Sequence, residues 1–237
     1  MLATVSHLAR SLSAPLFDFI FPRACLNCQQ LLNDGQRYVC VPCWDAIERV
    51  HPQHPLFSDT KEKLLASGTV SDLVSCFVFQ TEGTFQRLAH AMKYEGFERL
   101  GVWLGRELGK IVEAQAVHAD FLIPIPLHRR KFRERGYNQA EIIARGVSEV
   151  MSIPVRSDVV RRWRFTETQT KLNIDQRQNN MEDAFEIIPG KEKEVDGKIC
   201  MIVDDVITTG ATIHSCAAEL ISAGASQVIA ASLALAQ

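Results

Sequence analysis

From about residue 70, the pattern of apolar positions switches repeatedly between short continuous runs and a helical spacing. Short runs rich in β-branched residues predict buried strands, and apolar positions three or four residues apart predict helices. The predicted strands cover residues 74–79, 120–126, 197–203 and 227–235, and the predicted helices cover 84–92, 100–112, 140–150 and 212–223. Strands that alternate with helices predict an α/β fold with an open, mostly parallel sheet, whose ligands bind at the carboxyl ends of the strands.

Two segments lack this alternation. Residues 51–63 are rich in proline, histidine and charge and are expected to form a linker, and residues 161–180 form a long polar stretch. We therefore predict two domains: 1–65, with an N-terminal segment, a cysteine module and the linker, and 66–237, the α/β domain.

The apolar stretch Leu12–Phe21 is the one candidate for a targeting or membrane segment. Pro15 and Asp18 interrupt it, it is too short to span a bilayer, and no small-residue cleavage site follows. We expect a short amphipathic segment, no membrane insertion and a cytoplasmic location.

Four of the seven cysteines fall into two CxxC pairs, Cys25/Cys28 and Cys40/Cys43. Two such knuckles can complete a tetrahedron of thiolates around zinc, and the Asn33-Asp34-Gly35 turn between them suits a zinc-ribbon hairpin. Disulfides are the alternative, but a cytosol keeps thiols reduced. Four thiolates close the coordination sphere, so the predicted Zn²⁺ is structural.

Charge is distributed unevenly along the chain. The net charge is −2, but residues 128–178 hold twelve Lys/Arg against six Asp/Glu, which leaves −8 for the remainder. A local excess of this kind can attract phosphates although the whole molecule is not basic.

A predicted buried strand ends at Val203 and is followed by two acids, Asp204 and Asp205. Uncompensated charge is costly in a core, so both side chains must face solvent or a ligand. The hydroxyl- and glycine-rich turn that follows opens a helix, and backbone amides at a helix N-terminus bind anions. Its residues are Thr208, Thr209, Gly210, Ala211 and Thr212. Ribose 5-phosphate suits the combination, with phosphate in the turn and ribose hydroxyls on the carboxylates.

Other phosphate loops fit less well. No Gly-Lys-Ser/Thr and no GxGxxG is present, which excludes a Walker A loop and a dinucleotide fingerprint. An ordinary capped helix is the remaining alternative, with Asp and Thr serving only as caps.

The run 203–212, Val-Asp-Asp-Val-Ile-Thr-Thr-Gly-Ala-Thr, resembles the signature of type I phosphoribosyltransferases. The resemblance implies that Asp204 and Asp205 hold the ribose hydroxyls as catalytic residues and that residues 208–212 hold the 5′-phosphate. Residues 123–140, the spacing of polar positions between 162 and 185, and the four-cysteine module resemble the ComF/GntX branch of that family.

Arginines near this site are candidates for binding pyrophosphate. The turn after the strand 120–126 can bring backbone amides and Arg129 or Arg130 to a pyrophosphate, and it matches the family's pyrophosphate loop, although a solvated charged surface is the alternative. The stretch 161–180 matches the family's mobile loop, which implies a catalytic role for Arg164 and pyrophosphate binding by Arg177. Lys93 is a weaker candidate for the same anion site, with a surface lysine as the alternative.

Two functions follow from the resemblance. A ComF protein is expected to bind phosphoribosyl pyrophosphate or ribose 5-phosphate and to act in natural competence, handling single-stranded DNA with a helicase-like partner; Tyr137, Trp163 and Phe132 lie within the basic segment that would contact DNA. Alternatively, a metabolic phosphoribosyltransferase, a glycosyltransferase that uses Mg²⁺, would transfer ribose 5-phosphate to an unidentified nucleophile.

Overall fold

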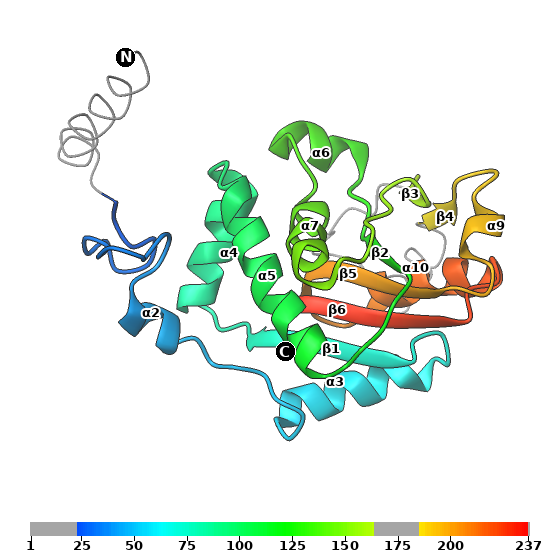
Figure 1. Ribbon diagram of the computed structural model, residues 1–237, viewed down its shortest axis with the longest axis horizontal. Coiled ribbons are helices and arrows are strands. Elements are labelled where there is room, and N and C mark those ends of the chain that lie inside the picture. The colour runs from blue at the N-terminus through cyan, green and yellow to red at the C-terminus, as the bar shows by residue number, and fades with distance from the viewer. Residues whose placement is uncertain (1–22, 164–184, 237) are drawn as a thin grey trace, which may run out of the picture. The chain divides into compact units, whose positions relative to one another are not determined.

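The computed structural model describes residues 23–163 and 185–236 (Figure 1). The chain divides into two compact units, Met1–Ile47 and Glu48–Gln237. The amphipathic segment predicted over 12–21 lies outside the described residues, as do Arg164, Arg177 and most of the predicted loop over 161–180. None of the described helices has the length and apolar character needed to cross a bilayer.

The larger unit is built on a four-stranded sheet in which every neighbouring pair is parallel. Its strands, β1 (Asp72–Val78), β2 (Phe121–Pro124), β5 (Ile199–Ile207) and β6 (Gln227–Leu235), lie in the order β1-β6-β5-β2. The predicted open parallel α/β fold is therefore confirmed. β5 is central and runs four residues beyond the predicted end at Val203, because Asp204 still pairs with Ser232 of β6.

Helices cover both faces of this sheet. α4 (Thr84–Tyr94) leads into α5 (Glu98–Ala114), which lies beside α7 (Gln139–Met151) in Figure 1. Gly105 and Gly146 allow the close contact of α5 with α7, because a Cβ on Gly105 would lie 2.2 Å from the Ile143 carbonyl oxygen. On the other face, Ile202 of β5 shares a buried cluster with Cys216 and Leu220 of α10 (Ala211–Ser222).

The predicted linker over 51–63 is wrong, because Pro55–Ala66 form helix α3. Pro55 stands at its first position, where the fixed φ of proline suits a helix start, and His54 Nδ1 accepts a hydrogen bond from the Leu56 amide at 3.2 Å. Phe57 and Leu64 of α3 are buried in the cluster that contains α10. The helix therefore belongs to the larger unit, and the two units divide after Ile47, not near residue 65.

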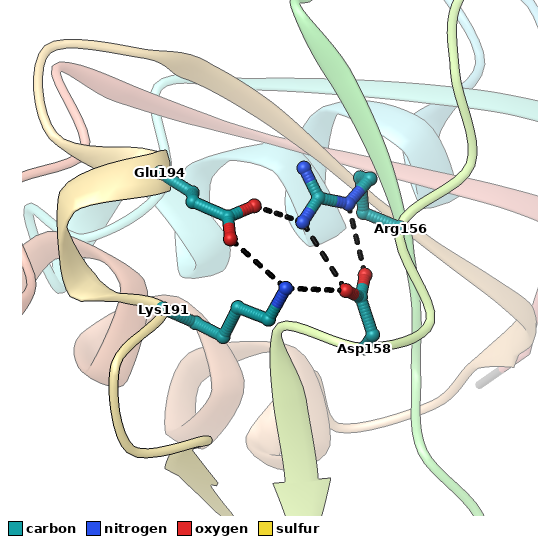
Figure 2. Close-up of polar contacts among 4 residues, drawn as sticks. All are labelled: Arg156, Asp158, Lys191 and Glu194. Carbon is teal, nitrogen blue, oxygen red and sulfur yellow. Dashed lines mark hydrogen bonds and ion pairs between the residues drawn. The ribbon is translucent and has the colours of Figure 1, made fainter.

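Four further elements were not predicted: helix α6 (Arg129–Arg135), the strands β3 (Val160–Arg162) and β4 (Phe185–Ile187), which form an antiparallel pair, and helix α9 (Glu192–Val195). Four charged side chains tie the segment before β3 to α9 (Figure 2). Asp158 accepts from Arg156 Nε at 2.8 Å and contacts Lys191 Nζ at 2.7 Å, and Glu194 contacts both cations.

Candidate functional site

The four CxxC cysteines converge in the smaller unit, which contains the short helix α2 (Val41–Asp45). Their sulfur atoms all lie within 4.8 Å of one another, and Cys28 Sγ is 3.6 Å from Cys40 Sγ. Zn–S bonds of about 2.3 Å place tetrahedral sulfurs about 3.8 Å apart, so the cluster fits a metal ion such as zinc. The predicted turn is present, since the Gln36 amide donates to the Asn33 carbonyl at 3.1 Å.

Hydrogen bonds favour an ionised sulfur at Cys25, whereas burial and the neighbouring thiols raise the pKa of Cys40 to about 12 and also raise the pKa of Cys43. The Cys40 amide donates to Cys25 Sγ and Asn27 Nδ2 donates to Cys43 Sγ, each at 3.4 Å. Burial acts to raise the pKa of Cys25, but hydrogen bonds from the amides of Cys28, Cys40 and Asn27 outweigh it and lower that pKa to about 6. All seven cysteines are free of disulfides, so the alternative of two disulfide pairs does not hold in this structure.

In the larger unit, the predicted acids lie near the carboxyl end of β5, both half-buried. Successive side chains of a strand point to opposite faces, so Asp204 lies on the face of Ile202 and α10, and Asp205 lies on the face of α5 and α7. The Asp205 amide donates to Asp204 Oδ1 at 2.8 Å.

Cations approach this carboxylate pair from distant parts of the chain. Lys93, in the last turn of α4, places Nζ 2.5 Å from Asp205 Oδ2. Burial, followed by the negative charge of Asp205, raises the pKa of Asp204 to about 7, although Lys93 and Arg162 of β3 oppose this shift. The pair therefore carries less than two full negative charges at neutral pH.

The predicted phosphate loop joins β5 to α10. Thr208 and Thr209 are exposed, and Ala211 and Thr212 are half-buried in the first turn of the helix. Gly210 stands at the N-cap of this twelve-residue helix with φ +77° and makes no side-chain cap, and the Ala211 amide donates to Thr209 Oγ1 at 3.4 Å. This arrangement can bind a phosphate through backbone N–H groups and hydroxyls.

Leu64 of α3 packs closely against Gly210 of the loop. A Cβ on Gly210 would lie 2.7 Å from Leu64 Cδ2, and the Leu64 side chain is 1% exposed. This contact was not predicted, because the composition of residues 51–63 suggested a linker in place of α3.

Arg129 and Arg130, two of the three arginines predicted to bind pyrophosphate, lie on α6, which begins soon after β2 and contains no buried residue. Arg130 Nε contacts Glu134 Oε1 at 3.3 Å on the solvent-exposed surface. Arg129 lines a cleft of about 550 Å³ between α6 and the β3–β4 hairpin, together with Phe132, Arg161 and Trp163. The described residues that line this cleft include none from 204 to 212, but Arg162 lines it and also interacts with Asp204.

The segment Arg135–Gln139 has structural contacts. Tyr137 donates its hydroxyl hydrogen to the Met92 carbonyl, and Asn138 Nδ2 donates to the Ile125 carbonyl at 2.9 Å. Asn138 Oδ1 also caps α7 by accepting from the Ala140 amide, and Arg135 Nη1 donates to the buried Gln139 at 2.8 Å. These contacts fix α4, the end of β2 and α7 relative to one another.

Lys131 of α6 was not among the predicted site residues. Its side chain is half-buried, and burial, then Arg135 and Arg162, lower its pKa. Its position in the run Arg129–Arg135, one helical turn before Arg135, was the available signal, since residues four apart share a helix face.

The phosphoribosyl transferase domain model matches residues 134–237. Competence protein F of Haemophilus influenzae is 32% identical over 121 residues, which are 47% of this chain and 52% of the relative. DNA utilization protein YhgH of Shigella flexneri is 36% identical over 109 residues, 46% of each chain. Competence protein ComFC of Bacillus subtilis is 33% identical over 103 residues, 44% of this chain and 39% of the relative. The chain spans about half the length of the first two relatives and less of the third.

Proposed function

Because this chain is a ComF-family protein with a type I phosphoribosyltransferase fold, we propose that it binds phosphoribosyl pyrophosphate or ribose 5-phosphate at the end of β5. The observation that carries the proposal is the pair Asp204/Asp205 immediately before the glycine-capped N-terminus of α10. Carboxylates accept hydrogen bonds from ribose hydroxyls, and the loop 208–212 takes the 5′-phosphate. Mg²⁺ bound with phosphoribosyl pyrophosphate would neutralise part of the pyrophosphate charge.

Ligand-induced stabilisation tests this binding. Phosphoribosyl pyrophosphate with Mg²⁺ at about 100 times its Kd should stabilise the wild-type protein by about 2.7 kcal/mol, because it binds the folded state alone. The double variant Asp204→Asn/Asp205→Asn should lose most of this gain, whereas Asp59→Asn, a substitution of an exposed acid on α3, should keep it. An equal gain for all three proteins would contradict the proposal.

We further propose that the protein acts in natural competence, handling single-stranded DNA in the cytoplasm with a helicase-like partner. The printed names of its relatives concern competence and DNA utilization. Physical support comes from the cleft beside α6, where Phe132 is 47% and Trp163 49% exposed and Arg129 and Arg161 also line the wall. Exposed rings can stack on bases while arginines contact the phosphates.

DNA binding is measured by fluorescence anisotropy with a labelled single-stranded oligonucleotide. Phe132→Ala/Trp163→Ala should weaken binding about tenfold, since each stacked base contributes about 1–3 kcal/mol. Ile221→Ala removes an exposed apolar side chain on α10 and should have no effect. Wild-type protein that fails to bind DNA at low salt would remove the physical support for the competence role.

The process itself is tested in a strain from which the gene has been deleted. Transformation by added DNA should fall and should return with the wild-type gene but not with Asp204→Asn/Asp205→Asn. Restoration by the double variant would separate competence from the ribose-phosphate site.

Phosphoribosyl transfer is the second candidate function, in which the protein is a glycosyltransferase. The observation that favours it is the position of the cleft. Arg162 lines the cleft and also interacts electrostatically with Asp204, and the cleft volume of about 550 Å³ leaves room for a second substrate. Release of pyrophosphate from phosphoribosyl pyrophosphate in the presence of candidate acceptors would support transfer, and binding without release would favour a role in binding alone.

A further inference from the structure

Lys93 forms an ion pair with Asp205, one of the two carboxylates that the proposed function assigns to the ribose. Its Nζ lies 2.5 Å from Asp205 Oδ2, and the two side chains are 23% and 15% exposed. Lys93 stands in the last turn of α4, where the helix dipole favours a cation. A largely buried ion pair must offset the loss of hydration, which requires that its geometry is held by the surrounding structure.

Residues at and after the end of α6 hold the neighbours of Lys93 on both sides. The Tyr137 hydroxyl donates to the Met92 carbonyl. The guanidinium carbon of Arg135 lies 5.3 Å from the centre of the Tyr94 ring, and Arg135 Nη2 donates to the Tyr94 hydroxyl at 3.4 Å. These contacts fix the last turn of α4 at positions 92 and 94. They therefore fix the point from which the Lys93 side chain reaches β5.

Each of the two carboxylates is oriented through one of its oxygens. Asp204 Oδ1 accepts from the Asp205 amide at 2.8 Å, and Asp205 Oδ2 is held by Lys93. The second oxygen of each group is the acceptor that the proposed function offers to a ribose hydroxyl. A carboxylate that is already oriented loses less side-chain freedom when the hydroxyl binds.

The charge of Lys93 also affects the ionisation of Asp204. Burial, followed by the negative charge of Asp205, raises the pKa of Asp204 to about 7, and the Asp205 amide, Lys93 and Arg162 of β3 oppose this shift. Cys216 of α10 also interacts with Asp204, but burial holds the pKa of this thiol far above its usual range, so it stays neutral. Without Lys93, Asp204 would take up a proton at a higher pH.

We propose that Lys93 is a positioning residue for ribose binding. It orients the Asp205 carboxylate for a ribose hydroxyl, and its positive charge allows Asp204 and Asp205 to be ionised together when the sugar binds. This role rests on the proposed function, and it assigns Lys93 to the carboxylates and not to a phosphate of the ligand. Loss of the lysine should therefore change how the affinity for ribose 5-phosphate depends on pH.

Calorimetric titration of ribose 5-phosphate from about pH 6 to about pH 9 tests this role. Wild-type affinity should rise as the pH passes about 7, because Asp204 loses its proton there. In Lys93→Gln the rise should move to higher pH. A shift of one pKa unit would weaken binding about fivefold at pH 7, and the loss should be smaller at pH 9.

Other groups that titrate in this range are the same in both proteins. His128, whose pKa is lowered by burial and by nearby arginines, and His214, whose pKa is lowered by burial, are unchanged in the variant. The phosphate of the ligand, with a second pKa of about 6, is also common to both titrations. The difference between the two pH profiles therefore reports on the carboxylates.

Three variants serve as controls. Lys93→Arg keeps the charge and should restore the wild-type pH profile. Tyr137→Phe removes the hydroxyl that holds the Met92 carbonyl and should shift the profile in the same direction as Lys93→Gln, but by less. Lys110→Gln should match the wild type, because Lys110 is an exposed lysine of α5 that pairs with Glu107 of the same helix.

An affinity in Lys93→Gln that equals the wild type at every pH would overturn the role. A loss of equal size across the whole pH range would also overturn it, because the lysine would then contact the phosphate directly or serve the fold alone. An arginine variant with the profile of Lys93→Gln would exclude the charge as the cause. These results leave the proposed function standing, whereas wild-type protein that binds no ribose 5-phosphate at any pH would contradict both.

Discussion

Gly210 holds the phosphate loop in a backbone conformation that other residues rarely adopt. Its φ is +77°, and the space where a Cβ would lie is closed by Leu64. Gly136, at the end of α6, has φ +82°, and a Cβ added there would meet nothing within 4 Å. Substitution of Gly136 therefore measures the free-energy cost of the left-handed conformation alone. Substitution of Gly210 adds the cost of the steric clash between a new Cβ and Leu64.

Gly210→Ala should destabilise the protein more than Gly136→Ala. The left-handed conformation costs a non-glycine residue about 1–2 kcal/mol, and the contact with Leu64 adds to this cost at residue 210 alone. Urea unfolding at neutral pH measures both free energies. Equal losses at the two positions would mean that Leu64 does not support the loop.

At the scale of residues, the chemistry that is local in sequence was predicted and the chemistry that depends on folding was not. The run from Asp204 to Gly210 predicts a local anion site without any knowledge of the fold. A strand end, a loop rich in hydroxyls and a helix start follow one another in it. Lys93 was only a weak candidate, because nothing in the sequence near it shows that the end of α4 lies against β5. The roles of Arg164 and Arg177 stay predictions.

The network of Arg156, Asp158, Lys191 and Glu194 joins two elements that the apolar pattern did not reveal (Figure 2). Hydrogen bonds from Arg156 and Lys191 hold the pKa of Asp158 well below its usual range, and Lys191, followed by Arg156, lowers that of Glu194. A carboxylate whose pKa is lowered by folding stabilises the protein above its unfolded pKa of about 4. That stabilisation is lost as the pH falls through the folded pKa.

Asp158→Asn should accordingly lower the free energy of unfolding at pH 7 by about 1 kcal/mol or less, since Asp158 is largely exposed. The difference from wild type should shrink as the pH is lowered from 5 toward 3. Glu149→Gln breaks the single exposed pair with Arg106 and should cost less at pH 7. Urea unfolding across this pH range measures the free energy of unfolding of the wild type, Asp158→Asn and Glu149→Gln. A loss of stability in Asp158→Asn that grows as the pH falls would contradict this role of the network.

At the scale of elements, helices and strands with strong apolar periodicity were predicted close to their observed ends. β6 matches at both ends, and α10 begins one residue early. α3 was missed because the prolines and charges of residues 51–63 suggested a linker, although Pro55 is well suited to a helix start. α6 and the β3–β4 hairpin bury too few residues to produce a pattern.

The whole molecule combines an α/β unit with a small unit whose described residues, 23–47, bury few apolar side chains. Segments this short rarely fold without a metal or disulfide, and the four cysteines form a cluster that could hold a metal ion. Their convergence was predictable because the two CxxC pairs lie within nineteen consecutive residues. The position of the domain boundary was not predictable, because it depends on where α3 packs.

Purified protein should contain about one zinc ion per chain, measured by mass spectrometry of the metal. Cys28→Ser/Cys43→Ser should lose it, whereas Cys200→Ala, a change in the core of the larger unit, should retain it. Chelation should expose four reactive thiols while the buried Cys76, Cys200 and Cys216 stay protected. One zinc ion per chain in the double variant would contradict the four-cysteine site, because the ion would then be bound by other residues.

The central claim, a ribose-phosphate site at the end of β5, is tested most directly by calorimetric titration of phosphoribosyl pyrophosphate with Mg²⁺. We expect saturable binding to the wild-type protein and a Kd raised at least tenfold in Asp204→Asn/Asp205→Asn, since each lost charged acceptor is worth about 1.5–3 kcal/mol. An unchanged Kd in the folded double variant, or no binding to the wild-type protein, would contradict it.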